Sequence, residues 1–404
     1  MLIYIPTMET PQLYNELVMR EITPQRAIQD DNFSRGVIDY NFSISNNTVF
    51  LPSKSYIRVE FADIPANYQL VDNAPSALFN NIYFKAGGSD ISSLTNFSSQ
   101  CEQTLKRLEK SQAYVDSAGA IHGYDNKAVL PGEAPANSNT LLQGQSLYIL
   151  YTPNIGIFKH EGGLASGDYR LSMNPNANFK NCCLTPLLGA VPANVANLKI
   201  KSMNFYIATA RVETPVSGTD KLILHASLAQ SKVLSNSGEQ QLDFVVPTST
   251  TALSFFIQDS RAGSSVLNDG GDALPAPITL FKTYGAPAVG VTPVSNDDLS
   301  LRSLQVSYAN TVKPPNRYTN ADGFEEISNQ QRYADTHAAA MGLQTITGPE
   351  AYVNYQKLGS IYHYEFSKPL DDRSTHVNLQ VNFKNITNIK QLNINSLYTK
   401  NEIR

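Results

Sequence analysis

The residue types that could bind a metal are scattered along this chain. A zinc site needs histidines, cysteines or carboxylates at ligand spacing, and the six histidines show neither an HExxH pattern nor paired positions on one strand: His122, His160, His225, His337, His363 and His376. The run Asp269-Gly-Gly-Asp272 lacks the ligand ladder of an EF-hand calcium loop, and an ordinary polar turn explains it better. The sequence therefore predicts no metal site and no cofactor.

Two pairs of adjacent carboxylates, Glu325-Glu326 and Asp371-Asp372, are the first candidates for glycoside hydrolysis. That reaction needs two carboxyl groups about 5 to 9 Å apart across a sugar, whereas sequence neighbours on a strand point to opposite faces. We interpret both pairs as solvated turns. A glycosidase built on strands would use strand carboxylates instead, of which Glu60 and Glu365 are the first to test.

Cys183 is the candidate nucleophile, but the sequence shows no His and Asn partners for it. It sits in a segment that resembles a loop, Asn181-Cys-Cys-Leu184, and a buried structural thiol is the better interpretation. Three cysteines, two of them adjacent, cannot form a disulfide framework, so a reducing compartment is expected. With no phosphate-binding glycine loop either, we predict no catalytic and no cofactor-binding residues.

The charge composition argues against several partners. The formal net charge is −4 and neither end carries a basic arm, so direct binding of nucleic acid is not expected. The start, Met1-Leu-Ile-Tyr-Ile-Pro6, lacks the features of a signal peptide, and no stretch is apolar enough to predict a membrane span. Only 16% of residues are charged, below the roughly 25% of typical soluble domains. An uncharged polar surface costs little to cover with another subunit.

Alternation of apolar and polar residues in short runs predicts a mainly β chain. The clearest strands are 38–44, 57–61, 362–366 and 377–383, where every second residue is apolar. The same pattern, in shorter or less regular form, predicts further strands at 82–84, 198–207, 222–228, 242–246, 253–257 and 304–308.

Three short helices are expected beside these strands. Capping boxes open two of them, at Ser99 with Glu102 and at Ser328 with Gln331. A third is expected near the start, with Thr10 and Pro11 as its cap and first position, and with an apolar stripe of Leu13, Tyr14, Leu17 and Val18.

The chain reads as two similar halves after a short arm. In each half, strands lead into a long turn region with one helix and then into two or three more strands, which favours an architectural duplication. We predict an N-terminal arm at 1–34, a first β domain at 35–213 and a second at 214–404, with a hinge in the turn-rich segment 214–220.

The segment from Asn154 to Lys180 resembles a stretch of double jelly-roll major capsid proteins, the lineage of Polinton-like viruses, virophages and the adenovirus hexon. In these proteins a strand with glycine, an apolar residue and phenylalanine leads through a glycine-containing loop into a Tyr-x-Leu strand and an Asn-Pro turn. The matching residues here are Gly156, Ile157, Phe158, Gly167, Tyr169, Leu171, Asn174 and Pro175.

This resemblance implies an all-β fold of two tandem eight-stranded jelly rolls, a double jelly roll, with a few short flanking helices. It also implies a structural major capsid protein whose homotrimers are pseudo-hexagonal capsomers that tile the icosahedral shell of a double-stranded DNA virus. The partners would be the chain itself, neighbouring capsomers, and minor capsid or penton proteins. The chain would reside in the virion after assembly in the host cytoplasm or nucleus.

Two other functions stay open at this point. The first is a glycan- or receptor-binding β-sandwich, such as a spike or lectin-like protein, with Pro314-Pro-Asn-Arg-Tyr318 as its nearest candidate loop, although a proline-rich turn explains that segment equally well. The second is the jelly-roll glycosidase. Because the chain is charge-poor, we expect subunit contacts rather than charges to cover its sheet edges.

Overall fold

The computed structural model describes a mainly β protein. The described residues are 16–28, 32–64, 68–70, 73–95, 118–123, 146–177, 179–186, 197–212, 221–234, 238–259, 301–308, 311–318, 362–366, 369–371, 376–383 and 390–403. None of the described helices is long and apolar enough to cross a membrane.

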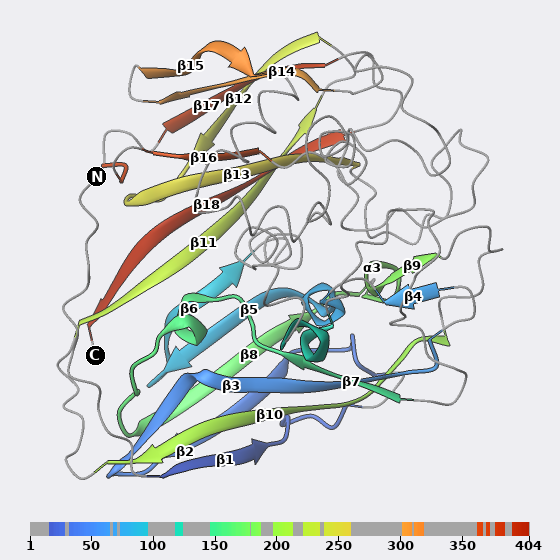
Figure 1. Cartoon of the computed structure of the whole chain (residues 1–404), viewed down its shortest axis with the longest axis vertical. Coiled ribbons are helices and arrows are strands. Elements are labelled where there is room, and N and C mark those ends of the chain that lie inside the picture. Colours follow the sequence, from blue (N-terminus) through green and yellow to red (C-terminus); the bar gives the residue numbers. More distant parts are fainter. Residues whose placement is uncertain are drawn as a thin grey trace.

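Eight strands of the described N-terminal half form two facing sheets (Figure 1). One sheet has the order β1-β10-β3-β7, and the facing four strands have the order β2-β8-β5-β6. In chain order these strands are β1 (Leu17–Ile22), β2 (Ile38–Ile44), β3 (Thr48–Ala62), β5 (Phe79–Ala86), β6 (Ser89–Thr95), β7 (Ser146–Tyr151), β8 (Gly167–Pro175) and β10 (Lys199–Arg211).

Eight strands of the described C-terminal half repeat this arrangement. Their sheets have the orders β11-β18-β13-β16 and β12-β17-β14-β15. In chain order they are β11 (Lys221–Leu234), β12 (Gly238–Val245), β13 (Thr250–Asp259), β14 (Leu301–Tyr308), β15 (Thr311–Tyr318), β16 (Tyr362–Glu365), β17 (His376–Phe383) and β18 (Lys390–Ile403).

The two eight-stranded units share one topology. If the strands of each unit are counted from first to eighth, both units pair them as first-eighth-third-sixth in one sheet and second-seventh-fourth-fifth in the other. Two such four-stranded sheets packed face to face make a jelly roll. The chain is therefore a double jelly roll, which confirms the fold and the duplication expected from the sequence.

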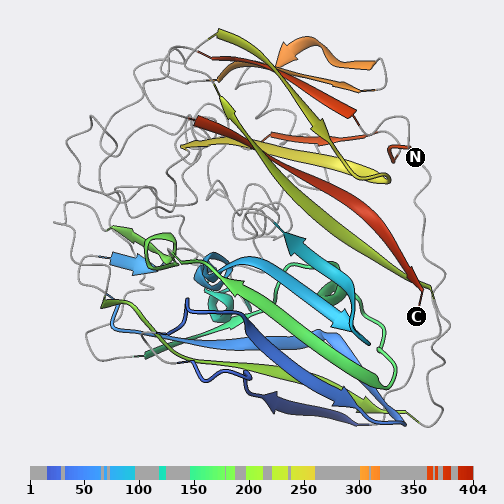
Figure 2. The same cartoon turned by 180° about the vertical axis from the view of Figure 1, so that it is seen from behind.

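The two jelly rolls are joined by a short parallel contact. Ser227 and Leu228 of β11 pair with Leu94 and Thr95, the last two residues of β6. This contact links the inner sheets of the two units into a single eight-stranded sheet. In the view from behind, the sheets succeed one another from β1-β10-β3-β7 at the bottom to β12-β17-β14-β15 at the top (Figure 2).

Short elements flank the first jelly roll. The described helices are η1 (Ala74–Leu78), η2 (Ala118–His122), η3 (Gly156–Lys159) and α3 (Phe179–Cys183). A small ladder of β4 (Tyr68–Leu70) and β9 (Leu184–Pro186) lies beside α3. These match the few short flanking helices that were expected.

The core of the first jelly roll is built from the buried alternate residues of its strands. Phe42, Phe50, Phe84, Tyr169 and Phe205 are buried and meet at centroid distances between 5.1 and 6.4 Å. Burying such rings supplies much of the stabilising free energy of a sandwich.

All ten predicted strands coincide with observed strands, but three other predictions about local structure are wrong. Leu17 and Val18 lie on strand β1 rather than on a helix. The Gly156-Ile-Phe motif forms the 3-10 helix η3 instead of a strand, and Pro314 to Tyr318 belong to β15 rather than to a turn. The helices expected at Ser99 and Ser328, and the helix residues Thr10 to Tyr14, lie outside the described residues.

The motif that carries the capsid resemblance has only part of the expected secondary structure. Tyr169 and Leu171 lie on β8 as predicted, and Gly167 opens that strand. Asn174 and Pro175 are the last two residues of β8 and pair with β5, so the Asn-Pro pair ends a strand rather than forming a turn.

Candidate assembly surface

The structure does not gather the residues that the sequence offered for metal binding. Among the described residues, no group of three or more His, Cys, Asp or Glu side chains is placed to hold a metal ion. His122 has a structural contact instead, with its Nδ1 2.8 Å from the carbonyl oxygen of Leu150. His337 and the run from Asp269 to Asp272 lie outside the described residues.

The candidate glycosidase carboxylates are not brought together either. Glu60 lies on β3 in the outermost sheet of the first jelly roll, whereas Glu365 lies on β16 at the far end of the eight-stranded sheet (Figure 1). Asp371 is exposed, and Asp372 and the Glu325-Glu326 pair lie outside the described residues. The two strand carboxylates therefore cannot face one sugar across a few ångströms.

Glu60 has a structural environment of hydrogen bonds. Ser202 donates to its Oε2 at 2.8 Å across β10 and β3. Partial burial raises the pKa of Glu60, but hydrogen bonds from Ser202, Ser146 and Tyr148 outweigh it and leave the pKa below its usual value. A general acid needs a raised pKa, so this carboxyl group is suited to holding strands together.

Cys182 and Cys183 are free thiols buried at the end of α3. Burial raises the pKa of Cys182 to about 12 and raises that of Cys183 well above its usual value. A nucleophilic cysteine needs the opposite shift. The predicted buried structural thiol is confirmed, although the segment that was expected to be a loop is a short helix.

The outer face of the sheet β1-β10-β3-β7 carries a row of aromatic rings around one guanidinium group. Arg58 on β3 lies 5.4 Å from the ring centroid of Tyr148 on β7 and 5.0 Å from that of Tyr206 on β10. The rings of Tyr56 and Tyr206 are stacked at 5.4 Å. Tyrosine and arginine are the residue types enriched at the centres of protein interfaces.

The row is supported from the edge strand. Asn204 on β10 donates a hydrogen bond of 2.5 Å to Oε1 of Glu21 on β1. Burial raises the pKa of Tyr206, and the hydrogen bond and charge of Glu21 raise it further. Tyr148 itself is 52% exposed. The result is a pre-ordered row of side chains with one large ring open to a partner.

The outer face of the opposite end sheet, β12-β17-β14-β15, carries amide and carboxylate side chains on β12, β17 and β14. Asn378 on β17 donates to Asp243, directly opposite on β12, at 2.7 Å, and Gln380 donates diagonally to Glu239. Gln305 and Ser307 on β14 continue these rows. At these positions the face offers amide and carboxylate oxygens as hydrogen-bond acceptors.

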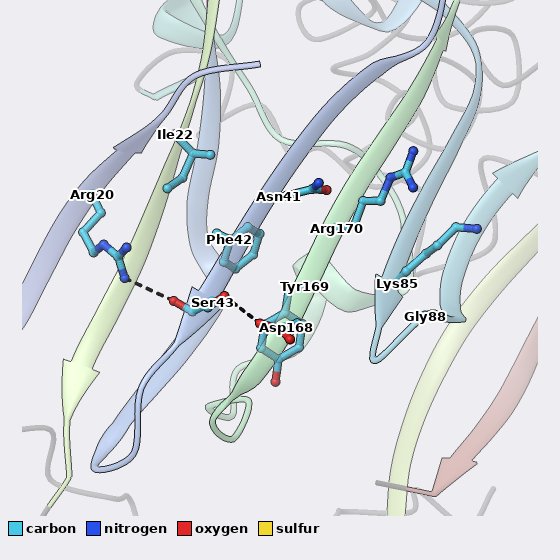
Figure 3. A pocket seen from close by; sticks show the side chains of 10 residues that line it. All are labelled: Arg20, Ile22, Asn41, Phe42, Ser43, Lys85, Gly88, Asp168, Tyr169 and Arg170. Atoms are coloured by element: carbon cyan, nitrogen blue, oxygen red, sulfur yellow. Dashed lines mark hydrogen bonds between the residues drawn. The ribbon is translucent and has the colours of Figure 1, made fainter. Parts of the chain in front are cut away.

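A polar hollow of about 690 Å³ lies where β1 approaches the outer side of β2 and β8 (Figure 3). Ser43 donates to Oδ1 of Asp168 at 2.6 Å at its floor, and Arg20 reaches the carbonyl oxygen of Ser43 from β1 at 3.4 Å. Its ten lining residues mix both charges: Arg20, Ile22, Asn41, Phe42, Ser43, Lys85, Gly88, Asp168, Tyr169 and Arg170. The hollow is an open groove between two sheet edges.

Strand β1 is the surface feature that sequence reasoning missed. It is an edge strand paired only with β10 among the described residues, yet Leu17, Val18 and Met19 are 58%, 43% and 40% exposed. An exposed apolar edge strand is a template for pairing and is normally covered. The apolar run of Leu17, Val18 and Met19 is the sequence signal for such a strand, but the spacing of Leu13, Tyr14, Leu17 and Val18 also fits a helix.

No known sequence family matches the chain, and no curated protein is similar to it in sequence. The fold, in contrast, is shared with viral capsid structures. A chain of the Sputnik virophage structure matches with a TM-score of 0.63 and 11% identity, over 100% of this chain and 93% of that chain. The Faustovirus major capsid protein matches with a TM-score of 0.59 and 7% identity, over 100% of this chain and 93% of the other.

The mavirus major capsid protein matches with a TM-score of 0.54 and 10% identity, over 98% of this chain and 93% of that protein. These likenesses extend over both jelly rolls, because they cover nearly the whole of each chain. They show that this chain has the double jelly-roll fold of the lineage that the segment 154–180 resembles.

Proposed function

We propose that this chain is the major capsid protein of a double-stranded DNA virus with an icosahedral shell. The observation that carries the proposal is the tandem repeat of one strand order in two jelly rolls, shared over the full chain with the Faustovirus and mavirus major capsid proteins. Localisation in the virion follows from this function.

The proposed unit of assembly is a homotrimer. Three copies with two similar jelly rolls each give six similar units around one axis, and such a pseudo-hexagonal block can tile a shell. The sheet β1-β10-β3-β7, which carries the aromatic row around Arg58, and the sheet β12-β17-β14-β15 lie at opposite ends of the molecule (Figure 1). In a closed ring we propose that these two end sheets meet between neighbouring copies.

The proposal also assigns the remaining partners and roles. Neighbouring capsomers and minor capsid or penton proteins would contact the trimer, and we propose no direct contact with nucleic acid because the formal net charge is −4. We propose no catalytic role, since the strand carboxylates are separated and the buried thiols have raised pKa values.

The division of the chain is part of the same proposal. The boundary between the jelly rolls at 213 and 214 lies outside the described residues. At the N-terminal end, strand β1 is the first strand of the first jelly roll, so we propose that this unit begins by Leu17 and that the arm comprises the residues before it.

The test is the mass and shape of the purified chain in solution. Light scattering should give about three times the 44.4 kDa of one chain, and negative-stain images of the same fraction should show a hexagonal outline. A stable monomer at micromolar concentration would contradict the trimer and bring the glycan-binding alternative forward.

A further inference from the structure

Each of the two strands in the parallel β6–β11 contact has an equivalent strand in the other jelly roll, at an end of the molecule. β6 is the fifth strand of the first jelly roll and β11 is the first strand of the second. The strand equivalent to β6 is β15, the fifth strand of the second unit, and the strand equivalent to β11 is β1, the first strand of the first unit. Neither β15 nor β1 has such a parallel partner among the described residues. Both are edge strands of their sheets.

From this equivalence we infer that β15 of one copy lies against β1 of the next copy, and that this strand junction closes the trimer. The inference rests on the proposed homotrimer and names the contact inside it. In a ring of six jelly rolls, in which first and second jelly rolls alternate, the fifth strand of each jelly roll would lie beside the first strand of the next. Three of these junctions are the β6–β11 contacts within each chain, and the other three join neighbouring chains.

The exposure of β1 supports the same junction. Leu17, Val18 and Met19 leave apolar surface at an edge that no described strand covers, whereas the equivalent strand β11 is paired on both sides, with β18 and with β6. Covering these three side chains removes apolar area from water and an unpaired strand edge from the surface. The occupant is a second copy of this chain because the chain already contains the equivalent contact.

The sequence of β15 limits how long this junction is. Pro314 and Pro315 lack backbone donors, so β15 cannot form a continuous ladder with another strand. The intramolecular contact is equally short, with Leu94 and Thr95 as its residues on the fifth strand. Their counterparts at the end of β15 are Arg317 and Tyr318.

Cysteine pairs test the junction directly. One cysteine replaces Val18 or Met19 on β1 and the other replaces Arg317 or Tyr318 on β15, in four separate double variants, because neighbouring strand residues point to opposite faces. Each variant is purified under reducing conditions, checked for trimers by light scattering, and then oxidised with copper phenanthroline. We expect at least one pair to give a covalently linked trimer in denaturing electrophoresis.

The matched control moves only the β1 cysteine. Val233→Cys lies on β11 and is 69% exposed in the wild type, and it is combined with Arg317→Cys or Tyr318→Cys. The wild type and the single variants should run as monomers after the same oxidation. Equal cross-linking by the Val233→Cys pairs would overturn the proposed junction, because the contact would then not be specific to β1.

The outcomes separate this inference from the proposed function. Trimers that form without a cross-link in any of the four pairs would overturn the β15–β1 junction and leave the capsomer proposal standing. A monomeric wild type would overturn both. If the variants fail to assemble, hydrogen exchange of the wild-type trimer decides: slow exchange over residues 17–22 is expected, and exchange as fast as in the monomer obtained by dilution would overturn the junction.

Discussion

Arg170 and Asp39 form a two-point ion pair across β8 and β2, with Arg170 Nη2 2.7 Å from Oδ2 of Asp39 and Nε 3.0 Å from Oδ1. Ser172 adds a hydrogen bond of 2.6 Å to Oδ1. β2 is an edge strand of the eight-stranded sheet. The pair therefore fastens an edge that has only one neighbouring strand among the described residues.

Replacing Asp39 with asparagine should destabilise the protein at pH 7. The amide keeps the shape of the side chain but loses the charge that the bidentate arginine contact needs, and Arg170 is 47% exposed, so solvent screens the pair. We expect the free energy of unfolding to fall by about 1 kcal/mol, measured by urea unfolding. Asp90→Asn is the control, since its contact with Lys85 is 3.2 Å long with both side chains more exposed than Asp39, and its effect should stay within about 0.5 kcal/mol.

The difference in the free energy of unfolding between the wild type and Asp39→Asn should depend on pH. Burial raises the pKa of Asp39, but the hydrogen bonds from Arg170 and Ser172 and the charge of Arg170 outweigh it, so the folded-state pKa is below the usual value. A carboxyl group with a lowered folded-state pKa contributes its full stabilisation at pH values above its unfolded-state pKa of about 3.9. This contribution is lost as the pH falls through the lowered folded-state pKa. The free energies of unfolding of the two proteins, measured by urea unfolding between pH 7 and pH 2, should therefore converge only at the acid end. A difference between them that grew on acidification would contradict the lowered pKa of Asp39.

Tyr148→Ala tests the aromatic row as a contact between copies. If the outer face of β1-β10-β3-β7 is buried in the trimer, loss of this half-exposed ring should cost about 1 to 2 kcal/mol per contact, or about a tenfold or larger rise in the concentration at which trimers dissociate. Mass photometry across a dilution series measures this. Val233→Ala removes a comparably exposed apolar side chain outside the row and should leave the dissociation concentration unchanged.

The regular part of the fold was predictable because burial imposes a pattern. Where one face of a strand packs on a core, as at Ile38 to Ile44, apolar and polar residues must alternate, and the observed burial follows that alternation. The duplication was visible for the same reason, since both halves repeat strands separated by long turns. The strand order of each jelly roll could not be derived, because it depends on pairings between residues far apart in the chain.

The candidate assembly surface was largely hidden from sequence reasoning. β1 is exposed along almost its whole length, so burial imposes no alternation on Leu17 to Ile22, and spacing alone favoured a helix. Arg58 and Tyr148 are separated by the whole of β5 and β6, and only the β3–β7 pairing places them side by side. The contact between β6 and β11 involves two residue pairs, too few to leave a pattern in the sequence.

Phe50→Ala should unfold the first jelly roll or come close to it. The ring of Phe50 stacks on Phe84 at 5.9 Å, meets Phe42 edge-on at 5.1 Å and is fully buried. A cavity of this size costs about 3 to 5 kcal/mol, whereas Phe50→Leu retains most of the volume and should cost about 1 to 2 kcal/mol. Differential scanning calorimetry of both variants measures the two losses. Equal transition temperatures for the wild type and Phe50→Ala would contradict the placement of this ring in the core.

The buried thiols give a final prediction about accessibility. In a Cys101→Ser background, Cys182 and Cys183 are the remaining cysteines. Cys183 donates to the carbonyl oxygen of Ala74 at 3.4 Å, and burial raises the pKa of both thiols, that of Cys182 to about 12. At pH 8 the thiolate of Cys182 is therefore present at about one part in ten thousand. Iodoacetamide should label neither residue in the native protein and both after unfolding in urea, as measured by mass spectrometry. Val233→Cys in the same background supplies an exposed thiol that should react within minutes, and native labelling of Cys182 or Cys183 at a similar rate would show that α3 opens readily and does not bury them.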